Sequence, residues 1–510
     1  MERPYREGCL ADCRGGVIVM MPILLWLPIT LPIIGGLLLP VLHFRSPRLR
    51  NAYVMTVTLA ASIVMGILVL MPPEGAHKLI HFTGSLDFAI SIDGLGRVFA
   101  ALMAVLWPLV TLYAFSYMEE DADSTRFFAL FTMTFGIALG VALSANLLTM
   151  YCFYEMLSLI TVPLVMHDFT QEAVHAARKY LYYMLGGTAF AFIGLVFVIV
   201  YGSTSYFTPG GVFTSGTLAA SAMLLRGVYL LTFFGFGAKA AIFPLHAWLP
   251  DASVAPTPVT ALLHAVAVVN AGVFAITRTT YMIFGAELIQ GSTVQVFLWC
   301  VVLFTILYGS SMAVKETHLK RRLAYSTVAN LSYMLLGVIL LTPEGLAAGI
   351  LHMVFHGVMK IALFCCAGAI LVRAKRAYVC EMNGLSRAMP VTFACFTVSV
   401  LSLVGIPPFS GFVSKWALAE ASLQSANGIL GALSAGMLLV SALLTAIYGL
   451  MVSVRAYFYP VDARNEALGN VDPDGRMLFP IILTTVACLI LGLYAQPLIR
   501  WLTAMTAGLF

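Results

Sequence analysis

Residues 235–251 read GFGAKAAIFPLHAWLPD and place Lys239 in the middle of an otherwise apolar segment. Glycines and prolines flank the lysine, so we expect a helix that is interrupted at this point. Residues 405–415, GIPPFSGFVSK, have the same character, and Gly-Phe-x-x-Lys occurs at 235–239 and again at 411–415. Broken helices at matching places in two halves of a chain are typical of transport sites near the middle of a membrane.

The composition indicates an integral membrane protein. Of 510 residues, 61% are hydrophobic and 10% are charged, whereas charged residues make up about 25% of an ordinary globular protein. These proportions argue against a disordered chain, a disulfide-rich scaffold and a nucleic-acid-binding protein, because each needs more polar or cationic surface.

Helices that span a bilayer need about 20 apolar residues, because the hydrocarbon layer is about 30 Å thick. Fourteen stretches meet this requirement, and they predict an all-α polytopic membrane protein with short connections. The stretches are 17–42, 52–71, 94–117, 126–144, 146–166, 179–201, 225–248, 256–283, 294–313, 322–342, 344–372, 390–418, 429–457 and 477–500. Residues 72–93 alternate in polarity and predict a small hairpin outside the membrane.

The repeated motif and the order of spans around it predict four regions. Residues 1–124 hold spans 1–3 and the external hairpin, and residues 125–283 form a first five-helix repeat with spans 4–8. Residues 284–457 form a second five-helix repeat with spans 9–13, and residues 458–510 contribute span 14.

The loops differ in charge between the two predicted sides. One side carries roughly twice as many Lys and Arg residues as the other, and the positive-inside rule places that side in the cytoplasm. With an even number of spans, both termini are expected on the external side of a cytoplasmic membrane.

The polar leader MERPYREGCLADCRGG is not expected to be a cleavable signal, because the apolar run after it is too long and lacks a small-residue cleavage site. Cys9 and Cys13 resemble a redox pair, but an overextended start, with Met20 or Met21 as the first residue, explains them better. The other cysteines have no metal-ligand spacing and are interpreted as small apolar fillers.

Ionisable residues inside the predicted spans are the candidate functional groups. The charged ones are Glu155, Lys239, Lys360 and Lys415, and they are joined by His264, His352 and His356. A charge in the bilayer centre costs at least about 2.5–3.5 kcal/mol, so four such charges indicate a function. For each histidine, a neutral packing role is an equally good interpretation.

Two arrangements follow from the positions of these residues. Glu155 on the fifth span and Lys239 on the seventh are expected to form a pair that controls the protonation of the lysine. His352, His356 and Lys360 share one face of the eleventh helix over about 12 Å. This face is interpreted as a proton wire, with a purely structural polar face as the alternative.

Four blocks resemble a known superfamily. They are FPLHAWLPDASVAPTPVTALLHAVAVVNAGVF (243–274), KRRLAYSTVANLSYM (320–334), LHMVFHGVMKIALF (351–364) and GIPPFSGFVSKW (405–416). Their order is similar to that in the antiporter-like subunits of respiratory complex I, Mrp-type cation/proton antiporters and energy-converting membrane-bound hydrogenases. The resemblance covers roughly residues 90–460.

The resemblance implies a fourteen-helix fold with two inverted five-helix repeats, each with a discontinuous helix, and a proton path near the membrane midplane. It further implies roles for the buried ionisable residues: Glu155 and Lys239 as the ion pair, Lys360 with His352 and His356 as the central relay, Lys415 as the terminal site, and His264 as the eighth-helix histidine.

Accessory positions include two departures from the family. Lys179 lies where many members have a basic residue at the start of the sixth helix. Asn270 replaces the lysine of some members, so a lateral link there would be hydrogen-bonded, and His318 replaces an aspartate. His246 is interpreted either as a packing group at a helix end or as a proton-uptake group, and Asp251 is expected to cap the eighth span.

The main functional interpretation is a proton-translocating, antiporter-like subunit of a redox-driven pump, either complex I-like or hydrogenase-like. A subunit of an Mrp-type Na⁺/H⁺ antiporter and the energising subunit of an inorganic-carbon uptake system are the alternatives. The chain ends before the long lateral helix of the distal complex I subunit, which favours an Mrp-like or hydrogenase-associated member. We expect other membrane subunits as partners, with a peripheral hydrogenase or dehydrogenase module.

The transported ions are expected to be H⁺ and, in the antiporter alternative, Na⁺. Motifs for a cofactor, such as GxGxxG or a CxxC pair, are absent from the sequence, so we expect no catalytic residue, metal or cofactor of its own. Lipid is an expected partner and nucleic acid is not.

Overall fold

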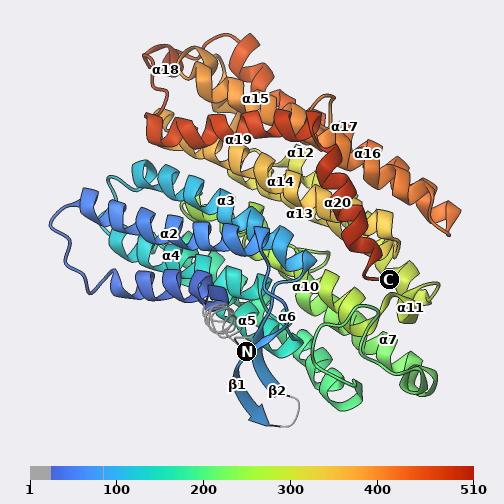
Figure 1. Ribbon diagram of the computed structural model, residues 1–510. Helices are drawn as coiled ribbons and strands as arrows, with labels where there is room; N and C mark the ends of the chain where they lie inside the picture. The colour runs from blue at the N-terminus through green and yellow to red at the C-terminus, as the bar shows by residue number, and fades with distance from the viewer. Residues whose placement is uncertain (1–23, 84–85) are drawn as a thin grey trace, which may run out of the picture.

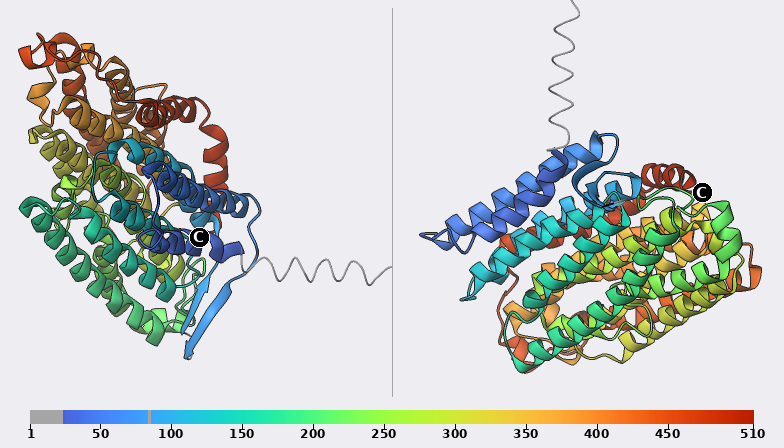
Figure 2. Two further views of the ribbon diagram at one scale, coloured as in Figure 1. Left: turned by 90° about the vertical axis from the view of Figure 1, so that its left-hand side faces the viewer. Right: turned by 90° about the horizontal axis from the view of Figure 1, so that it is seen from below.

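The computed structural model describes residues 24–83 and 86–510. Cys9, Cys13, Met20 and Met21 lie outside the described residues. The described chain is mostly helical, and its long helices run side by side in one bundle (Figures 1 and 2).

The first elements comprise three helices and a hairpin: the helix Leu24–Leu38, α2 (Pro47–Leu70), β1 (His77–Thr83), β2 (Leu86–Ile90) and α3 (Gly94–Tyr117). The hairpin predicted within residues 72–93 is confirmed, with β1 antiparallel to β2 and His77 opposite Ile90. Helix α3 begins directly afterwards, because the Asp93 side chain accepts a hydrogen bond from the Gly96 amide at 2.7 Å and caps the helix.

The next group of elements contains the first predicted break. It consists of α4 (Ser124–Ala142), α5 (Leu147–Val165), α6 (Gln171–Tyr201), α7 (Ser215–Gly237), α8 (Trp248–Asp251), η1 (Ala252–Val254), α9 (Thr257–Ala265), α10 (Val268–Arg278), η2 (Thr279–Phe284) and α11 (Ala286–Ile289).

The remaining elements contain the second predicted break. They are α12 (Thr293–Lys315), α13 (Leu319–Ile339), α14 (Pro343–Ala369), η3 (Ile370–Ala374), η4 (Val379–Met382), η5 (Leu385–Arg387), α15 (Pro390–Val404), α16 (Ser410–Leu423), α17 (Gly428–Phe458), α18 (Ala463–Glu466), α19 (Gly475–Leu493) and α20 (Gln496–Ala507).

Eleven helices in the described part are long and apolar enough to cross a membrane. The other three of the fourteen predicted stretches are also helical. Helix Leu24–Leu38 is short in its described part, α13 begins with the basic residues 320–322, and the stretch 390–418 is divided between α15 and α16.

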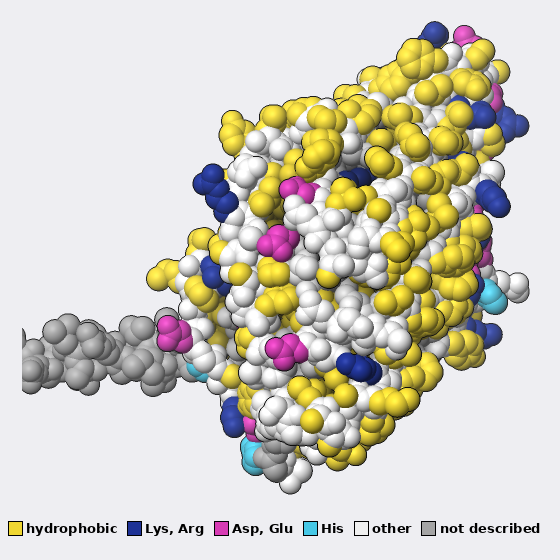
Figure 3. All heavy atoms as spheres, turned by 90° about the vertical axis from the view of Figure 1, so that its right-hand side faces the viewer, with side chains coloured by type: hydrophobic (Ala, Val, Ile, Leu, Met, Phe, Trp, Pro, Cys, Tyr) yellow, Lys and Arg dark blue, Asp and Glu magenta, His cyan; other side chains and the backbone are white. Residues whose placement is uncertain are grey.

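Two segments form the centre of the bundle. The segment Thr257–Phe284 is completely buried, and nearly all of α14 is buried, whereas α2, α7 and α19 keep exposed apolar faces. Hydrophobic side chains also cover much of the surface in Figure 3. Helices that are apolar on all sides belong in the core, and the exposed apolar faces are suited to lipid. The central helices carry most of the candidate residues.

Candidate functional site

The first predicted break lies at the end of α7, which stops at Gly237, and a series of turns leads from there to α8. Two backbone carbonyls at the break accept hydrogen bonds from side chains: Phe236 O from the Tyr154 hydroxyl at 2.9 Å, and Ala238 O from Trp248 Nε1 at 2.8 Å. The interruption is therefore stable in an apolar environment, because side chains replace helical hydrogen bonds.

Lys239 lies in this break and is 1% exposed. Its Nζ donates a hydrogen bond to the Tyr154 carbonyl oxygen and lies 3.4 Å from the centroid of the Tyr154 ring. The ammonium is thus held by a neutral carbonyl and by the negative face of an aromatic ring.

The predicted direct ion pair between Glu155 and Lys239 is not formed in the described structure. Consecutive residues of a helix point about 100° apart, so a lysine that lies on Tyr154 has the next side chain at its flank. The half-buried Glu155 nevertheless lies close enough to Lys239 for a coulombic attraction between the two side chains.

Three predicted residues occupy one face of α14. His352, His356 and Lys360 are completely buried, and the two imidazole centroids lie 6.1 Å apart. The predicted stacking along the helix is confirmed, and its role in proton transfer stays a prediction.

His352 has a defined hydrogen-bond network. Asn330 Nδ2 donates to the Ser326 carbonyl at 2.7 Å, which turns Asn330 Oδ1 toward His352 Nε2 at 3.1 Å. Ser414 Oγ lies 2.9 Å from His352 Nδ1. Since Oδ1 can only accept, this network favours the neutral tautomer with its proton on Nε2 and with Ser414 donating to Nδ1.

Lys360 is also held by neutral oxygen atoms. Its Nζ donates to the Leu323 carbonyl at 2.9 Å and to Ser326 Oγ at 2.8 Å, and the Tyr448 hydroxyl donates to the same Oγ at 2.6 Å. Helices α13, α14 and α17 therefore meet at this lysine.

Lys415 lies at the second predicted break, which is confirmed. Helix α15 ends at Val404, and Gly405 follows with a φ of +93°, a conformation that favours glycine. Lys415 Nζ reaches back from α16 to the carbonyls of Leu403 at 2.7 Å and Val404 at 3.1 Å. These oxygens belong to the last turn of α15, which lacks helical donors.

His264 and Asn270 flank a third break, which the sequence does not predict, between α9 and α10. Asn270 Nδ2 donates to the Ala265 carbonyl at 2.9 Å. Asn270 thus bonds the backbone beside its own helix, and the hydrogen-bonded lateral link expected at this residue stays a prediction. The His264 ring stacks on Phe364 at 4.8 Å. Both ring nitrogens of His264 and of His356 lack hydrogen-bond partners among the described residues.

Lys179 and Asp251 form an ion pair with an Nζ–Oδ2 distance of 2.6 Å, and Arg321 lies 3.4 Å from the same carboxylate. The expectation that Asp251 caps the eighth span is therefore wrong. The carboxylate is drawn to two cations from α6 and α13, and α9 begins only at Thr257.

His246 and His318 are not among the residues that contact Lys239, Lys360 or Lys415 in the described structure. The His246 ring packs on Phe243 at 5.5 Å and on Tyr308 at 4.7 Å, which fits the packing interpretation. His318 precedes α13 and packs on Tyr378 at 5.4 Å, and burial lowers the pKa of its imidazole.

Other buried cations, among them Lys320 and Arg278, are not distinguishable from loop residues in the sequence. Lys320 is 4% exposed and donates to the Ala255 carbonyl at 2.7 Å. Arg278 is completely buried, pairs with Asp93 at 2.6 Å and donates to the Ser144 carbonyl. Both lie at span ends, where a sequence does not reveal whether a long side chain turns inward.

Among the described residues, one group has the geometry to hold a metal ion, namely Asp121, His167 and Asp168. His167 Nε2 is already paired with Asp121 at 3.2 Å, and Arg126 donates to the His167 carbonyl at 2.9 Å. His167 is therefore already held by Asp121 and Arg126.

Comparison with known proteins identifies the relatives of this arrangement. The family described as NADH:quinone oxidoreductase/Mrp antiporter, TM, matches residues 144–456. The family described as NADH-Ubiquinone oxidoreductase (complex I), chain 5 N-terminus, matches residues 80–128.

Two curated relatives represent different complexes. NADH-quinone oxidoreductase subunit L of Mycobacterium tuberculosis is 34% identical over 447 residues, which is 85% of this chain and 69% of the relative. One of the Na(+)/H(+) antiporter subunits of Alkalihalophilus pseudofirmus is 29% identical over 494 residues, which is 91% of this chain and 60% of the relative.

A chain of the Mrp complex from Dietzia sp. has the same fold, with a TM-score of 0.80 and 24% identity, over 95% of this chain and 97% of that chain. The matched family covers all three helix breaks and the buried lysines Lys239, Lys320, Lys360 and Lys415. The chain therefore belongs to the NADH:quinone oxidoreductase/Mrp antiporter family of antiporter-like membrane subunits.

Proposed function

We propose that this chain is the proton-translocating, antiporter-like subunit of a multi-subunit membrane complex that is driven by a redox module. One observation carries the proposal. Lys239, Lys360 and Lys415 are buried within the bundle, and in the described part of the chain each is held by neutral groups, without a carboxylate at ion-pair distance.

Neutral acceptors suit a lysine that gains and loses a proton. A buried pair with a carboxylate holds the lysine charged, and breaking such a pair is strongly unfavourable. Carbonyl and hydroxyl oxygens instead accept from either –NH₃⁺ or –NH₂, so the side chain can change its charge without losing its place. This property supports a role in proton transfer over a purely structural role.

The proposed path runs from Lys239 to Lys415. Gly272 of α10 packs against the backbone of Lys239, and the His264 ring of α9 stacks on Phe364 of α14. The unpartnered ring nitrogens of His264 and His356 are the groups that we expect to bind water molecules on this route. From Lys360 the path continues along α14 to His352, whose neighbour Ser414 precedes Lys415.

Coulombic repulsion gives the path its order. Lys360 and Lys415 carry like charges inside one apolar bundle, so we expect a proton on either lysine to disfavour a proton on the other. At the start of the path, the half-buried Glu155 follows Tyr154, on which Lys239 lies, and is the carboxylate that we expect to influence the lysine. A movement that changes one of these interactions would therefore pass the proton onward.

The finer architecture belongs to the same proposal. We propose fourteen spans, with inverted five-helix repeats at 125–283 and 284–457, between an N-terminal region 1–124 and a C-terminal region 458–510. The breaks after α7 and after α15 support this division, because Gly-Phe-x-x-Lys spans the end of α7 at 235–239 and follows the end of α15 at 411–415. Both termini are placed on the external side of the cytoplasmic membrane.

A second candidate function is a subunit of an Mrp-type Na⁺/H⁺ antiporter. The similarity to one of the Na(+)/H(+) antiporter subunits of Alkalihalophilus pseudofirmus favours it. In that case the same lysines carry H⁺ and partner subunits carry Na⁺.

The experiment uses the native complex, purified from its own membranes and reconstituted into vesicles with a pH-sensitive dye. Lys239→Ala should abolish proton translocation while the subunit stays in the complex. Wild-type translocation by that variant would contradict the proposal. Replacement of Na⁺ by choline separates the two candidates, because only an Na⁺/H⁺ antiporter needs Na⁺.

A further inference from the structure

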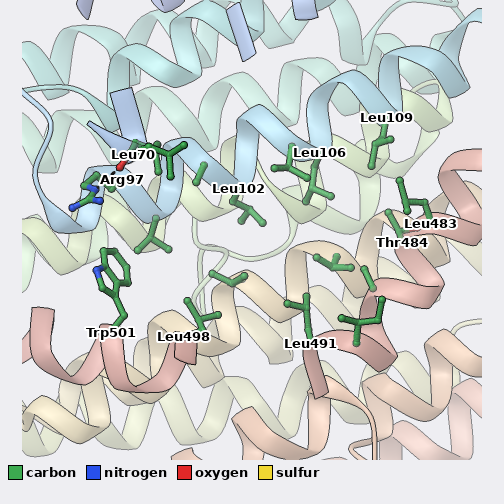
Figure 4. Close-up of a pocket in the computed structure, with 18 residues that line it drawn as sticks. Leu70, Arg97, Leu102, Leu106, Leu109, Leu483, Thr484, Leu491, Leu498 and Trp501 are labelled. Atoms are coloured by element: carbon green, nitrogen blue, oxygen red, sulfur yellow. Dashed lines mark hydrogen bonds between the residues drawn. The ribbon is translucent and has the colours of Figure 1, made fainter. Parts of the chain in front are cut away.

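A groove of about 620 Å³ lies between α3, α14, α19 and α20, on a side of the bundle that the proposed proton path does not use (Figure 4). Leu102 and Leu106 of α3 face Leu491 of α19 and Leu498 of α20 across it. Its α14 wall is formed by Val354 and Val358, each two residues from a histidine and thus on a different face of that helix.

One end of this groove is cationic. Arg97 lies in the first turn of α3, and its Nε donates to the Val69 carbonyl at 3.0 Å. Its two terminal nitrogens make no hydrogen bond to any residue that the structure describes, and no described carboxylate forms an ion pair with it. A guanidinium with free N–H groups beside an apolar groove matches a ligand that joins a phosphate or carboxylate to a hydrocarbon part.

Trp501 of α20 marks the same end. Its ring lies 5.5 Å from the Arg97 guanidinium carbon, on the opposite wall of the groove (Figure 4). Tryptophan and arginine concentrate where the hydrocarbon layer meets the lipid headgroups. The end with Arg97 and Trp501 is therefore expected at the membrane interface, and the groove runs from there toward the membrane interior.

The length of the groove matches one leaflet. From Arg97 to Leu109, helix α3 rises about 18 Å, which is close to half of a hydrocarbon layer of about 30 Å. Over this length the groove is lined almost entirely by apolar side chains, which suits one extended acyl chain.

We propose that this groove binds one phospholipid. An acyl chain lies between α3 and α19, and the phosphodiester accepts hydrogen bonds from the Arg97 guanidinium beside Trp501. The lipid fills the seam between α3 of the N-terminal part and α19 of the C-terminal part, which lie on its two sides in Figure 1. The inference depends on the groove alone and is independent of the proton path.

Native mass spectrometry of the purified, delipidated full chain tests the proposal, with phosphatidylglycerol and diacylglycerol as the added probes. Diacylglycerol has the same acyl chains without the phosphate. The wild type should bind one phosphatidylglycerol tightly and prefer it to diacylglycerol. Arg97→Gln should reduce that preference about tenfold, because a hydrogen bond to a charged group contributes roughly one decade in affinity.

Matched variants keep the test specific. Val105→Trp should block the groove and abolish the tight site for both lipids, and Val105 is 64% exposed, so the larger side chain fits without disturbing the core. Ile63→Trp on α2, where Ile63 is 62% exposed, is its control. Arg226→Gln is the control for Arg97→Gln, because Arg226 Nε also donates to a single backbone carbonyl, that of Leu288.

Two results would overturn the proposal. One is unchanged phosphatidylglycerol binding in both Arg97→Gln and Val105→Trp, which would place the bound lipid elsewhere. The other is efficient disulfide formation between Val105→Cys and a cysteine on a partner subunit's helix in the native complex, which would identify a protein as the occupant.

Discussion

The Nζ atom of Lys239 lies 3.4 Å from the centre of the Tyr154 ring and donates a hydrogen bond to the Tyr154 carbonyl. Lys239, the lysine of the first break, is therefore held by the neutral Tyr154. Glu155 is the next residue of α5 and makes no direct ion pair with Lys239 in the described structure. Lys360 and Lys415 are held in the same manner, by carbonyl and hydroxyl oxygens. The proposed mechanism rests on this shared feature, because neutral groups allow both charge states of a lysine.

Two substitutions of Tyr154 distinguish the contribution of its ring from that of its hydroxyl. Tyr154→Phe removes the hydrogen bond to Phe236 O and should destabilise the fold by about 1 kcal/mol while proton translocation persists. Tyr154→Leu also removes the cation–π contact, worth about 2 kcal/mol when desolvated. Translocation by the reconstituted complex should then fall markedly. Equal translocation rates in the two variants would show that the ring does not stabilise the charged lysine.

The network around His352 predicts an effect of Asn330. Asn330→Leu leaves His352 Nε2 without its acceptor, and an unsatisfied buried polar group costs about 1–3 kcal/mol. We expect a lower thermal stability and slower proton translocation. Ser332→Ala on the same helix is the control, since Ser332 Oγ donates only to the Val328 carbonyl. If Asn330→Leu had the same thermal stability and translocation rate as Ser332→Ala, Asn330 would have no role in the relay.

The pair Arg278–Asp93 should be essential for stability and not for proton transfer. Asp93→Ala leaves the completely buried Arg278 without its carboxylate, which should cost about 3–5 kcal/mol. Asp123→Ala breaks the exposed pair with Arg126 and should cost less than about 1 kcal/mol. Thermal unfolding of the two variants in detergent measures the difference, and equal losses would contradict this account.

The β1–β2 hairpin should be sensitive to acid. The Lys78 ammonium, with His81 and the Tyr206 hydroxyl, holds the pKa of Asp87 well below its ordinary value of 3.8. A carboxylate with a lowered pKa in the folded state stabilises the fold above pH 3.8, and this contribution is lost as the pH falls toward its folded-state pKa. The protection of the β1 amides, measured relative to the intrinsic exchange rate at each pH, should therefore fall below about pH 4.

Asp87→Asn is the matched variant for this experiment. It should exchange faster at neutral pH and lose most of the acid dependence, because its side chain does not titrate. Acid dependence equal to that of the wild type in Asp87→Asn would assign the effect to another group.

Glycine and proline made two of the three helix breaks predictable. They flank Lys239 and precede Lys415, and both interruptions occur there. The break between α9 and α10 falls within LLHAVAVVN (262–270), which contains neither residue. Its backbone is stabilised by Asn270 and by packing against α14, and that information lies in the tertiary structure.

The burial of charged residues was only partly predictable. Lys360 lies in the middle of a span and had to be buried, whereas Lys320 and Lys375 both lie at span ends, the first buried and the second exposed. The direct Glu155–Lys239 pair was expected because two opposite charges share an apolar bundle. Which residue of α5 faces the lysine depends on helix rotation, and a span prediction does not give that rotation.

The central claim is tested most directly by Lys360→Met, with proton translocation measured in the reconstituted native complex. Lys375→Met is the control, because it removes the same charge from an exposed site. The account predicts that Lys360→Met lowers translocation per turnover at least about tenfold, since one lost proton-transfer group contributes about 10²–10⁴-fold. The complex should stay assembled and Lys375→Met should act as the wild type. Wild-type translocation by an assembled complex with Lys360→Met would contradict the proposal that buried lysines on neutral oxygens carry the protons.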